Sequence, residues 1–223
     1  ETKIVLETPT GLVAVYVKWE NHMVASINLE NVPAFLYRKD LHIDLAGYGD
    51  VSVDIGYGGN FFVLADVHSL GLTITKDTVN LLRSLSKDIL AAANKVIKVA
   101  HPTNPAINYL DQVLFCQNVP EEDGGYLAQC IFGDAQADIS PCGTGTSTRL
   151  AQRYFRGLIG LEETFVQKSV CGGAFHAKGL RETTLGGVPA IVPYVSCSDV
   201  HITGFNHLIV EENDKLKNGF VSW

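Results

Sequence analysis

The chain has 223 residues, 46% of them hydrophobic and 18% charged, and these proportions are typical of an ordered globular protein with one large domain. Its net charge of −7, without any run of lysine or arginine, argues against nucleic acid or an anionic membrane as a partner. No apolar stretch approaches the ~20 residues that a membrane span needs.

The first third of the chain is mostly extended. Residues 3–30 hold three β-branched runs separated by turn residues, which predicts an antiparallel meander. Further strands are predicted at residues 42–45, 51–55 and 61–67. Residues 77–98 place apolar side chains at three- and four-residue steps, so they form the clearest predicted helix, with Thr75 or Asp77 as its cap. Such a stripe indicates core packing rather than function.

Strands also dominate the remainder of the chain. They are predicted at residues 111–115, 126–132, 163–170, 188–195 and 207–210. A second helix is predicted from about residue 145 to residue 156, where Gly157 ends it. The balance predicts an α+β domain in which a mostly antiparallel sheet curls around a buried central helix.

Five cysteines occur at irregular spacing, without a CxxC pair. This pattern fits neither a disulfide scaffold nor a structural zinc site, so we predict reduced thiols, no metal ligand set and a cytoplasmic protein. The first residues already resemble a strand, so no targeting segment is visible.

Residues 138–147, with the sequence DISPCGTGTS, carry the clearest chemical signal. They place Cys142 on a glycine- and threonine-rich turn that leads into the second predicted helix. A helix start has free N–H groups and partial positive charge, which favour a substrate carboxylate or the thiolate of Cys142 itself. Asp138 can hold a substrate ammonium or tune the thiol. The alternative is a structural cysteine beside an ordinary helix cap, with Asp138 in a turn.

Other chemistry finds less support. A nucleophilic cysteine hydrolase needs a histidine partner, but His176, His201 and His207 do not lie in a recognisable partner motif. The glycine spacing also differs from that of a nucleotide-binding P-loop.

The DISPCGTGTS segment resembles the second-cysteine motif of the proline racemase and hydroxyproline epimerase family. Supporting matches are spread over essentially the whole chain, at residues 7–12, 54–62, 101–105, 160–166, 202–206 and 217–220. The resemblance implies a diaminopimelate-epimerase-like fold and an isomerase that needs no cofactor. One cysteine thiolate would remove the α-proton of a proline-like amino acid, and a second thiol would deliver a proton to the opposite face.

The resemblance also implies roles for individual residues. Cys142 corresponds to the second of the two bases. Gly143 and Thr144 correspond to backbone amides that hold the substrate carboxylate. Asp138 corresponds to the group that holds the ring nitrogen, and Phe132 to an aromatic wall of the pocket.

Three positions depart from the family pattern. The first cysteine motif, of the Met-Cys-Gly-His-Gly type, is absent, Ile139 stands where arginine is usual, and residues 171–173 are Cys-Gly-Gly. We therefore expect a fragment that is inactive alone. Residues 1–204 would form the second domain of such an enzyme, and residues 205–223 would be a tail that returns to the missing first domain.

The substrate stays open between proline and 4-hydroxyproline. A cysteine at position 142 argues against the dehydratase branch, which usually has threonine there, and residues 107–113 look more like the racemase version. Asp111 or Gln112 could still meet a ring hydroxyl. A non-catalytic amino-acid-binding or interaction module is the alternative of a different class. The family further suggests a homodimer or a monomer of two similar halves.

Overall fold

The computed structural model of the protein describes residues 1–119, 125–202, 204–207 and 209–217. The first six strands are β1 (Thr2–Thr8), β2 (Gly11–Glu20), β3 (Met23–Glu30), β4 (Phe35–Leu45), β5 (Gly49–Tyr57) and β6 (Phe61–Asp66). A 3₁₀ turn (Val67–Leu70) and α1 (Val79–Val96) follow. The remaining elements are β7 (Gln112–Asn118), β8 (Gly125–Phe132), β9 (Gln136–Ala137), α2 (Gly143–Phe155), β10 (Phe165–Ser169), β11 (Ala174–Leu185) and β12 (Val188–Cys197).

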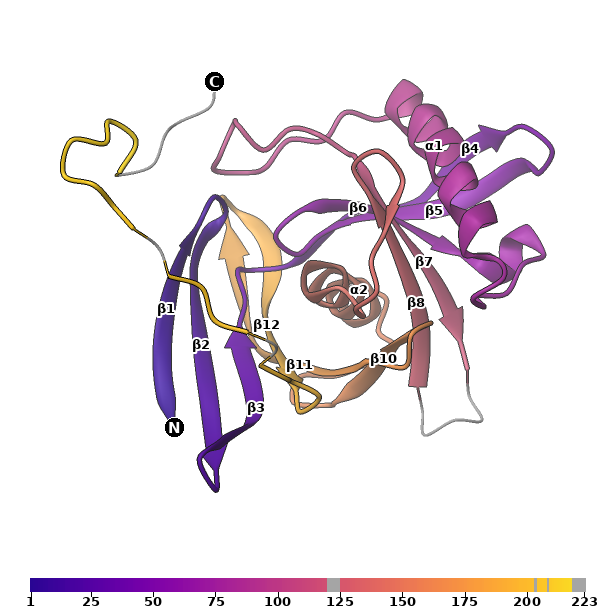
Figure 1. Ribbon diagram of the computed structural model, residues 1–223. Helices are drawn as coiled ribbons and strands as arrows, with labels where there is room; N and C mark the ends of the chain where they lie inside the picture. Colours follow the sequence, from indigo (N-terminus) through magenta and orange to yellow (C-terminus); the bar gives the residue numbers. More distant parts are fainter. Residues whose placement is uncertain (120–124, 203, 208, 218–223) are drawn as a thin grey trace.

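All the strands join one sheet, in the order β1-β2-β3-β12-β11-β10-β8-β7-β6-β5-β4, with β9 added beside β8. Two pairings are parallel, β8 with β10 and β6 with β7, and the other pairings are antiparallel. Figure 1 shows the sheet curled around α2, while α1 lies on the outside, near β4 and β7. The predicted α+β class and central helix are therefore confirmed.

The outer helix α1 buries one face. Leu82, Leu85, Ile89 and Ala93 point into the core, as the sequence spacing predicts. The predicted caps are wrong, because the helix begins after Thr78, whose side chain bonds to the preceding turn and not to the helix. In the described part of the chain, neither helix is long and apolar enough to cross a membrane.

The inner helix α2 is buried even where its side chains are polar. Thr146, Ser147 and Thr148 are inaccessible to solvent. Their hydroxyls donate to backbone carbonyls one turn earlier, so each of these three buried hydroxyls has an acceptor. Further along the helix Leu150 and Ala151 pack against the sheet.

Two expectations fail at the C-terminal end. The strand β11 is not among the predicted elements, yet it is the longest strand of the sheet at 12 residues. The strand predicted at residues 207–210 is wrong, since the described residues there are exposed and belong to neither a strand nor a helix, and Leu208 lies outside the described residues.

Candidate active site

Cys142 is the residue that starts α2. Its carbonyl accepts the first helical hydrogen bond from the Thr146 N–H at 2.8 Å, and its Sγ accepts the Gly145 N–H at 3.3 Å. The Cys142 backbone has φ of 65° and ψ of 110°, a region that residues with a side chain rarely adopt. Strain of this kind gathers at functional sites, where the surrounding structure must impose it.

Buried amide side chains hold the loop that leads into Cys142. Gln129 on β8 donates to the Asp138 carbonyl at 2.8 Å. Gln167 on β10, fully buried, donates to the Pro141 carbonyl at 2.8 Å. The Pro141 carbonyl also accepts the Thr146 hydroxyl at 3.2 Å, so both loop carbonyls have partners inside the protein. The two parallel strands β8 and β10 therefore hold Cys142 in place through the loop that precedes it.

Glycines let strand β5 and its following turn press against the first turns of α2. A Cβ on Gly58 would lie 2.6 Å from the backbone nitrogen of Thr148, and one on Gly56 would lie 2.7 Å from the Thr148 methyl group. From the other side, the Asn31 amide donates to the Gly58 carbonyl at 3.0 Å and to the Ser147 hydroxyl at 2.9 Å. The motif at residues 54–62 thus supports the helix start.

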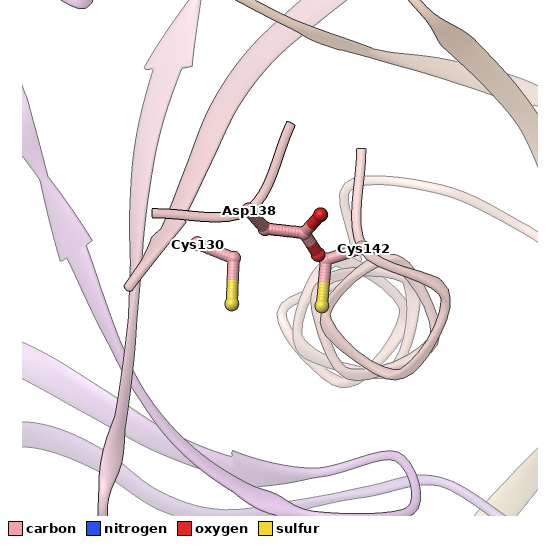
Figure 2. Close-up of side chains that lie close together, drawn as sticks. All are labelled: Cys130, Asp138 and Cys142. Atoms are coloured by element: carbon pink, nitrogen blue, oxygen red, sulfur yellow. The ribbon is translucent and has the colours of Figure 1, made fainter. Parts of the chain in front are cut away.

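Three acidic side chains meet at this helix start. The Sγ atoms of Cys130 and Cys142 and a carboxylate oxygen of Asp138 all lie within 4.8 Å of one another. Figure 2 shows the two thiols side by side, one from β8 and one from the start of α2, with the Asp138 side chain reaching toward Cys142. Both thiols are buried, whereas Asp138 is half-buried. We call this group the Cys130–Asp138–Cys142 cluster.

The pKa values of the two thiols in the cluster are shifted in opposite directions. The Cys130 thiol, the Gly145 N–H and the Thr144 hydroxyl lower the pKa of Cys142, and together they outweigh the effect of burial. The pKa of Cys130 is raised by its neighbour Cys142 and by burial. Only Cys142 receives a backbone N–H from a helix start, so the thiolate belongs on Cys142 and the proton on Cys130.

The other sequence-predicted site residues surround Cys142. Gly143 and Thr144 are the first residues of α2, and the Thr144 hydroxyl lies 3.7 Å from the Cys142 Sγ. Their N–H groups precede the first helical bond, and among the described residues no partner is recorded for them. Phe132 ends β8 and packs, half-buried, against the apolar cluster that contains Cys142. The structure therefore brings all five predicted residues to one place.

The candidate histidines lie elsewhere. His176, His201 and His207 are exposed, and His201 pairs with Asp199 at 3.0 Å. All five cysteines are free thiols in the structure.

The sequence reasoning missed Cys130. A signal was present, because side chains two residues apart share one face of a strand, and Phe132 was already assigned to the pocket. Ala128 and Cys130 occupy the same face of β8 and belong to the same apolar cluster as Cys142.

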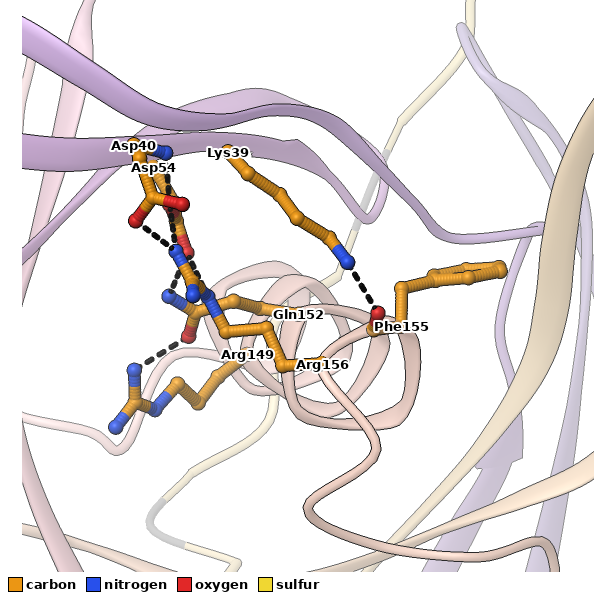
Figure 3. Close-up of polar contacts among 7 residues, drawn as sticks. All are labelled: Lys39, Asp40, Asp54, Arg149, Gln152, Phe155 and Arg156. Atoms are coloured by element: carbon orange, nitrogen blue, oxygen red, sulfur yellow. Dashed lines mark hydrogen bonds and ion pairs between the residues drawn. The ribbon is translucent and has the colours of Figure 1, made fainter.

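At its opposite end α2 is tied to β4 and β5 by charge. Arg156 donates to both oxygens of the buried Asp54, at 2.7 and 2.6 Å, and to Asp40 at 2.7 Å. Gln152 adds a bond to Asp54 at 2.5 Å, as Figure 3 shows. Burial raises the pKa of the Asp54 carboxyl. The hydrogen bonds from Arg156, Gln152 and the Asp40 N–H lower it by more than burial raises it, so the pKa lies below its ordinary value.

Comparisons with known proteins identify the family of the chain. The sequence model described as proline racemase matches residues 1–221. A trans-3-hydroxy-L-proline dehydratase from Burkholderia cenocepacia is 37% identical over 222 residues, which are 99% of this chain and 66% of the relative. A proline racemase from Acetoanaerobium sticklandii is 36% identical over 220 residues, which are 98% of this chain and 65% of the relative.

The fold also matches a solved structure. A hydroxyproline epimerase from Agrobacterium vitis with bound trans-4-hydroxy-L-proline aligns with a TM-score of 0.84 and 31% identity, over 99% of this chain and 63% of that one. The chain thus spans 63–66% of the length of these three proteins, which are a racemase, an epimerase and a dehydratase of proline-type amino acids. On the match of the family model over nearly every residue, the chain belongs to the proline racemase family.

Proposed function

We propose that the protein is a cofactor-independent isomerase that inverts the α-carbon of proline or a hydroxyproline, with Cys142 as one of two thiol acid/bases. One observation carries the proposal: the buried Cys142 sulfur sits at the start of α2, accepts the Gly145 N–H and has a lowered pKa. A helix start stabilises a thiolate there, and a thiolate near neutral pH can remove a proton.

The proposed substrate pose uses the groups around Cys142. The carboxylate would accept the N–H groups of Gly143 and Thr144, and the Asp138 carboxylate would pair with the ring ammonium. Phe132 would cover the ring. Each of these contacts holds the α-carbon near the Cys142 sulfur, and the anion-binding helix start would stabilise charge that develops on the carboxylate during proton removal.

Inversion needs a second base on the opposite face of the α-carbon. Reacting atoms stand about 3–3.5 Å apart, so the two sulfurs should be about 6–7 Å from each other with the carbon between them. Cys130 and Cys142 lie within 4.8 Å, which is too close, so Cys130 is not the second base. The family resemblance implies that this base belongs to a first cysteine motif, which these 223 residues do not contain, so we propose that a segment outside them supplies it. Residues 1–204 would be one half of the enzyme, and the chain alone would be inactive. The tail at residues 205–223 would contact the other half; residues 208 and 218–223 of this tail lie outside the described residues.

The substrate of the proposed reaction is either proline or a hydroxyproline, which differ in a ring hydroxyl. The dehydratase and racemase relatives differ by only one percentage point in identity, so identity does not separate them. Cys142 favours inversion over dehydration on the family pattern. Asp111 favours a hydroxylated ring, because its Oδ1 is buried without a partner among the described residues and its charge acts on Cys130. A 4-hydroxyproline epimerase is therefore the second candidate.

The experiment follows α-deuterium incorporation and the appearance of the D-isomer in heavy water, for the full-length protein with L-proline and with trans-4-hydroxy-L-proline. Cys142→Ser keeps a cap for α2 but lacks an effective base, so net inversion should fall by about 10²–10⁴-fold. Exchange from the other face can survive. Cys171→Ser, an exposed cysteine, is the control and should turn over normally.

Two outcomes would count against the proposal. If the Cys142→Ser variant inverted the α-carbon at the wild-type rate, Cys142 would not be one of the two acid/bases. Amino-acid binding without any α-exchange by the wild-type protein would instead identify a binding module. A planar analogue such as pyrrole-2-carboxylate should compete with the substrate if the α-carbon flattens in the transition state.

A further inference from the structure

The Cys130–Asp138–Cys142 cluster offers more ligating atoms than the proposed proton transfer uses. Its three side chains come from β8, from the loop after β9 and from the start of α2, and their ligating atoms all lie within 4.8 Å of one another. Cys130 exchanges no proton with the substrate in the proposed chemistry, yet it is buried beside the reactive sulfur. Linear spacing concealed the group, since the three residues match no zinc-binding motif.

Electrostatics around the cluster favour a cation. The charges that act on the Cys130 thiol come from the Cys142 thiolate and from two carboxylates, Asp138 and Asp111, and all three are negative. The Asp111 Oδ1 is buried and has no hydrogen-bond partner among the described residues. Asp138 commits one carboxylate oxygen to the Ser140 N–H at 2.8 Å, which orients the side chain and leaves its second oxygen to a ligand.

We propose that Cys130, Asp138 and Cys142 form a binding site for a thiophilic divalent cation of the Zn²⁺ type. Two sulfurs and one carboxylate oxygen are a donor set that Zn²⁺ accepts and that Mg²⁺ or Ca²⁺ do not prefer. Three protein ligands leave the fourth tetrahedral position to water.

The geometry requires only small movements. Zn–S bonds of about 2.3 Å in a tetrahedron place two sulfurs about 3.8 Å apart. The ligating atoms already lie within 4.8 Å, so side-chain rotations that close about 1 Å complete the site. The backbone of the loop is fixed by Gln129 and Gln167, so the ligands are held in place before the cation arrives.

A bound cation would exclude the amino-acid substrate, and this part of the inference rests on the proposed function. The metal would occupy the lone pair with which Cys142 removes a proton, and it would take the Asp138 oxygen assigned to the ring ammonium. Zn²⁺ would therefore act as an inhibitor that competes with substrate.

The test measures Zn²⁺ affinity of the full-length, TCEP-reduced protein by competition with a chromogenic chelator, without substrate. Cys130→Ala and Cys116→Ala are a matched pair, because both remove a buried thiol from the same apolar cluster and only Cys130 belongs to the proposed site. We expect one Zn²⁺ per chain in the wild type and in Cys116→Ala. Cys130→Ala and Asp138→Asn should each bind at least about tenfold more weakly.

A second measurement does not depend on the variants folding. Zn²⁺ should release protons on binding and should protect Cys130 and Cys142, but not the exposed Cys171, from alkylation mapped by mass spectrometry. Absence of a one-to-one complex, equal affinity of Cys130→Ala and Cys116→Ala, or unprotected Cys130 would overturn the proposal. These readouts need no turnover, so they stand or fall separately from the racemase assay.

Discussion

Replacing Arg156 by alanine should destabilise the protein strongly, because it leaves the Asp54 carboxylate charged in the core. Asp54 is 3% exposed, and Arg156 is 30% exposed and donates to both of its oxygens. Without the guanidinium, the carboxylate keeps only the Gln152 amide and the Asp40 N–H. The change therefore unpairs a buried charge and removes one of the contacts between the last turn of α2 and the sheet, while the Lys39 contact with the Phe155 carbonyl remains.

The size of the effect follows from the burial of the pair. Removing one partner of a buried ion pair costs about 3–5 kcal/mol, and the partial exposure of Arg156 places this case near the lower end, at about 3 kcal/mol. For a chain of this length the midpoint of thermal unfolding should fall by about 6–12 °C. Arg156→Lys retains the charge but not the two-pronged contact, so it should lie between alanine and wild type.

Urea and thermal unfolding followed by circular dichroism measure the difference. The control is Lys87→Ala, which removes the exposed Lys87–Asp134 pair and should unfold like the wild type. The pKa of Asp54 is lowered from 3.8, so its stabilising contribution is present above that pH and is lost as pH falls through the folded pKa. The gap between wild type and Arg156→Ala should therefore narrow in acid. Equal stability of Arg156→Ala and Lys87→Ala at neutral pH would refute the reasoning.

Three further predictions concern the helix start and the core. Gly58→Ala should cost about 1–3 kcal/mol in urea unfolding because its Cβ would meet the α2 backbone, whereas Gly173→Ala meets only ordinary contacts and should not. Cys130→Ala should raise the pKa of Cys142, seen as a higher pH midpoint for its alkylation, and an unchanged midpoint would contradict the assigned proton donor. Burial lowers the pKa of His101, so stability should decline below pH ~6.5, and His101→Gln should flatten that decline.

Local patterns were sufficient for much of the fold. The opening meander and helix α1 were predictable because strand alternation and the 3.6-residue period are visible within a few residues. The proximity of Asp138 and Cys142 at the start of α2 was predictable for the same reason, since one contiguous loop carries both.

Long-range pairing explains what the sequence did not reveal. β11 is largely polar and half-exposed, so its strand character comes from ladders with β10 and β12 rather than from its own residues. The apolar run near Ile209 resembled a strand but finds no pairing partner within the described residues, and Ile209 is 84% exposed. Cys130 became important only when the parallel contact of β8 with β10 brought β8 beneath the start of α2.

The backbone conformation at Cys142 is held by neighbouring residues and not by the Cys142 side chain. Gln129, Gln167 and the glycines of β5 impose the bend from outside, so the residue at position 142 does not itself have to create the turn. A hydroxyl in place of the thiol would still cap α2, and would cap it well, while its much higher pKa would end its use as a base. In the proposed mechanism, a single sulfur-to-oxygen exchange at position 142 would therefore change the chemistry of the site while the surrounding backbone stays as it is.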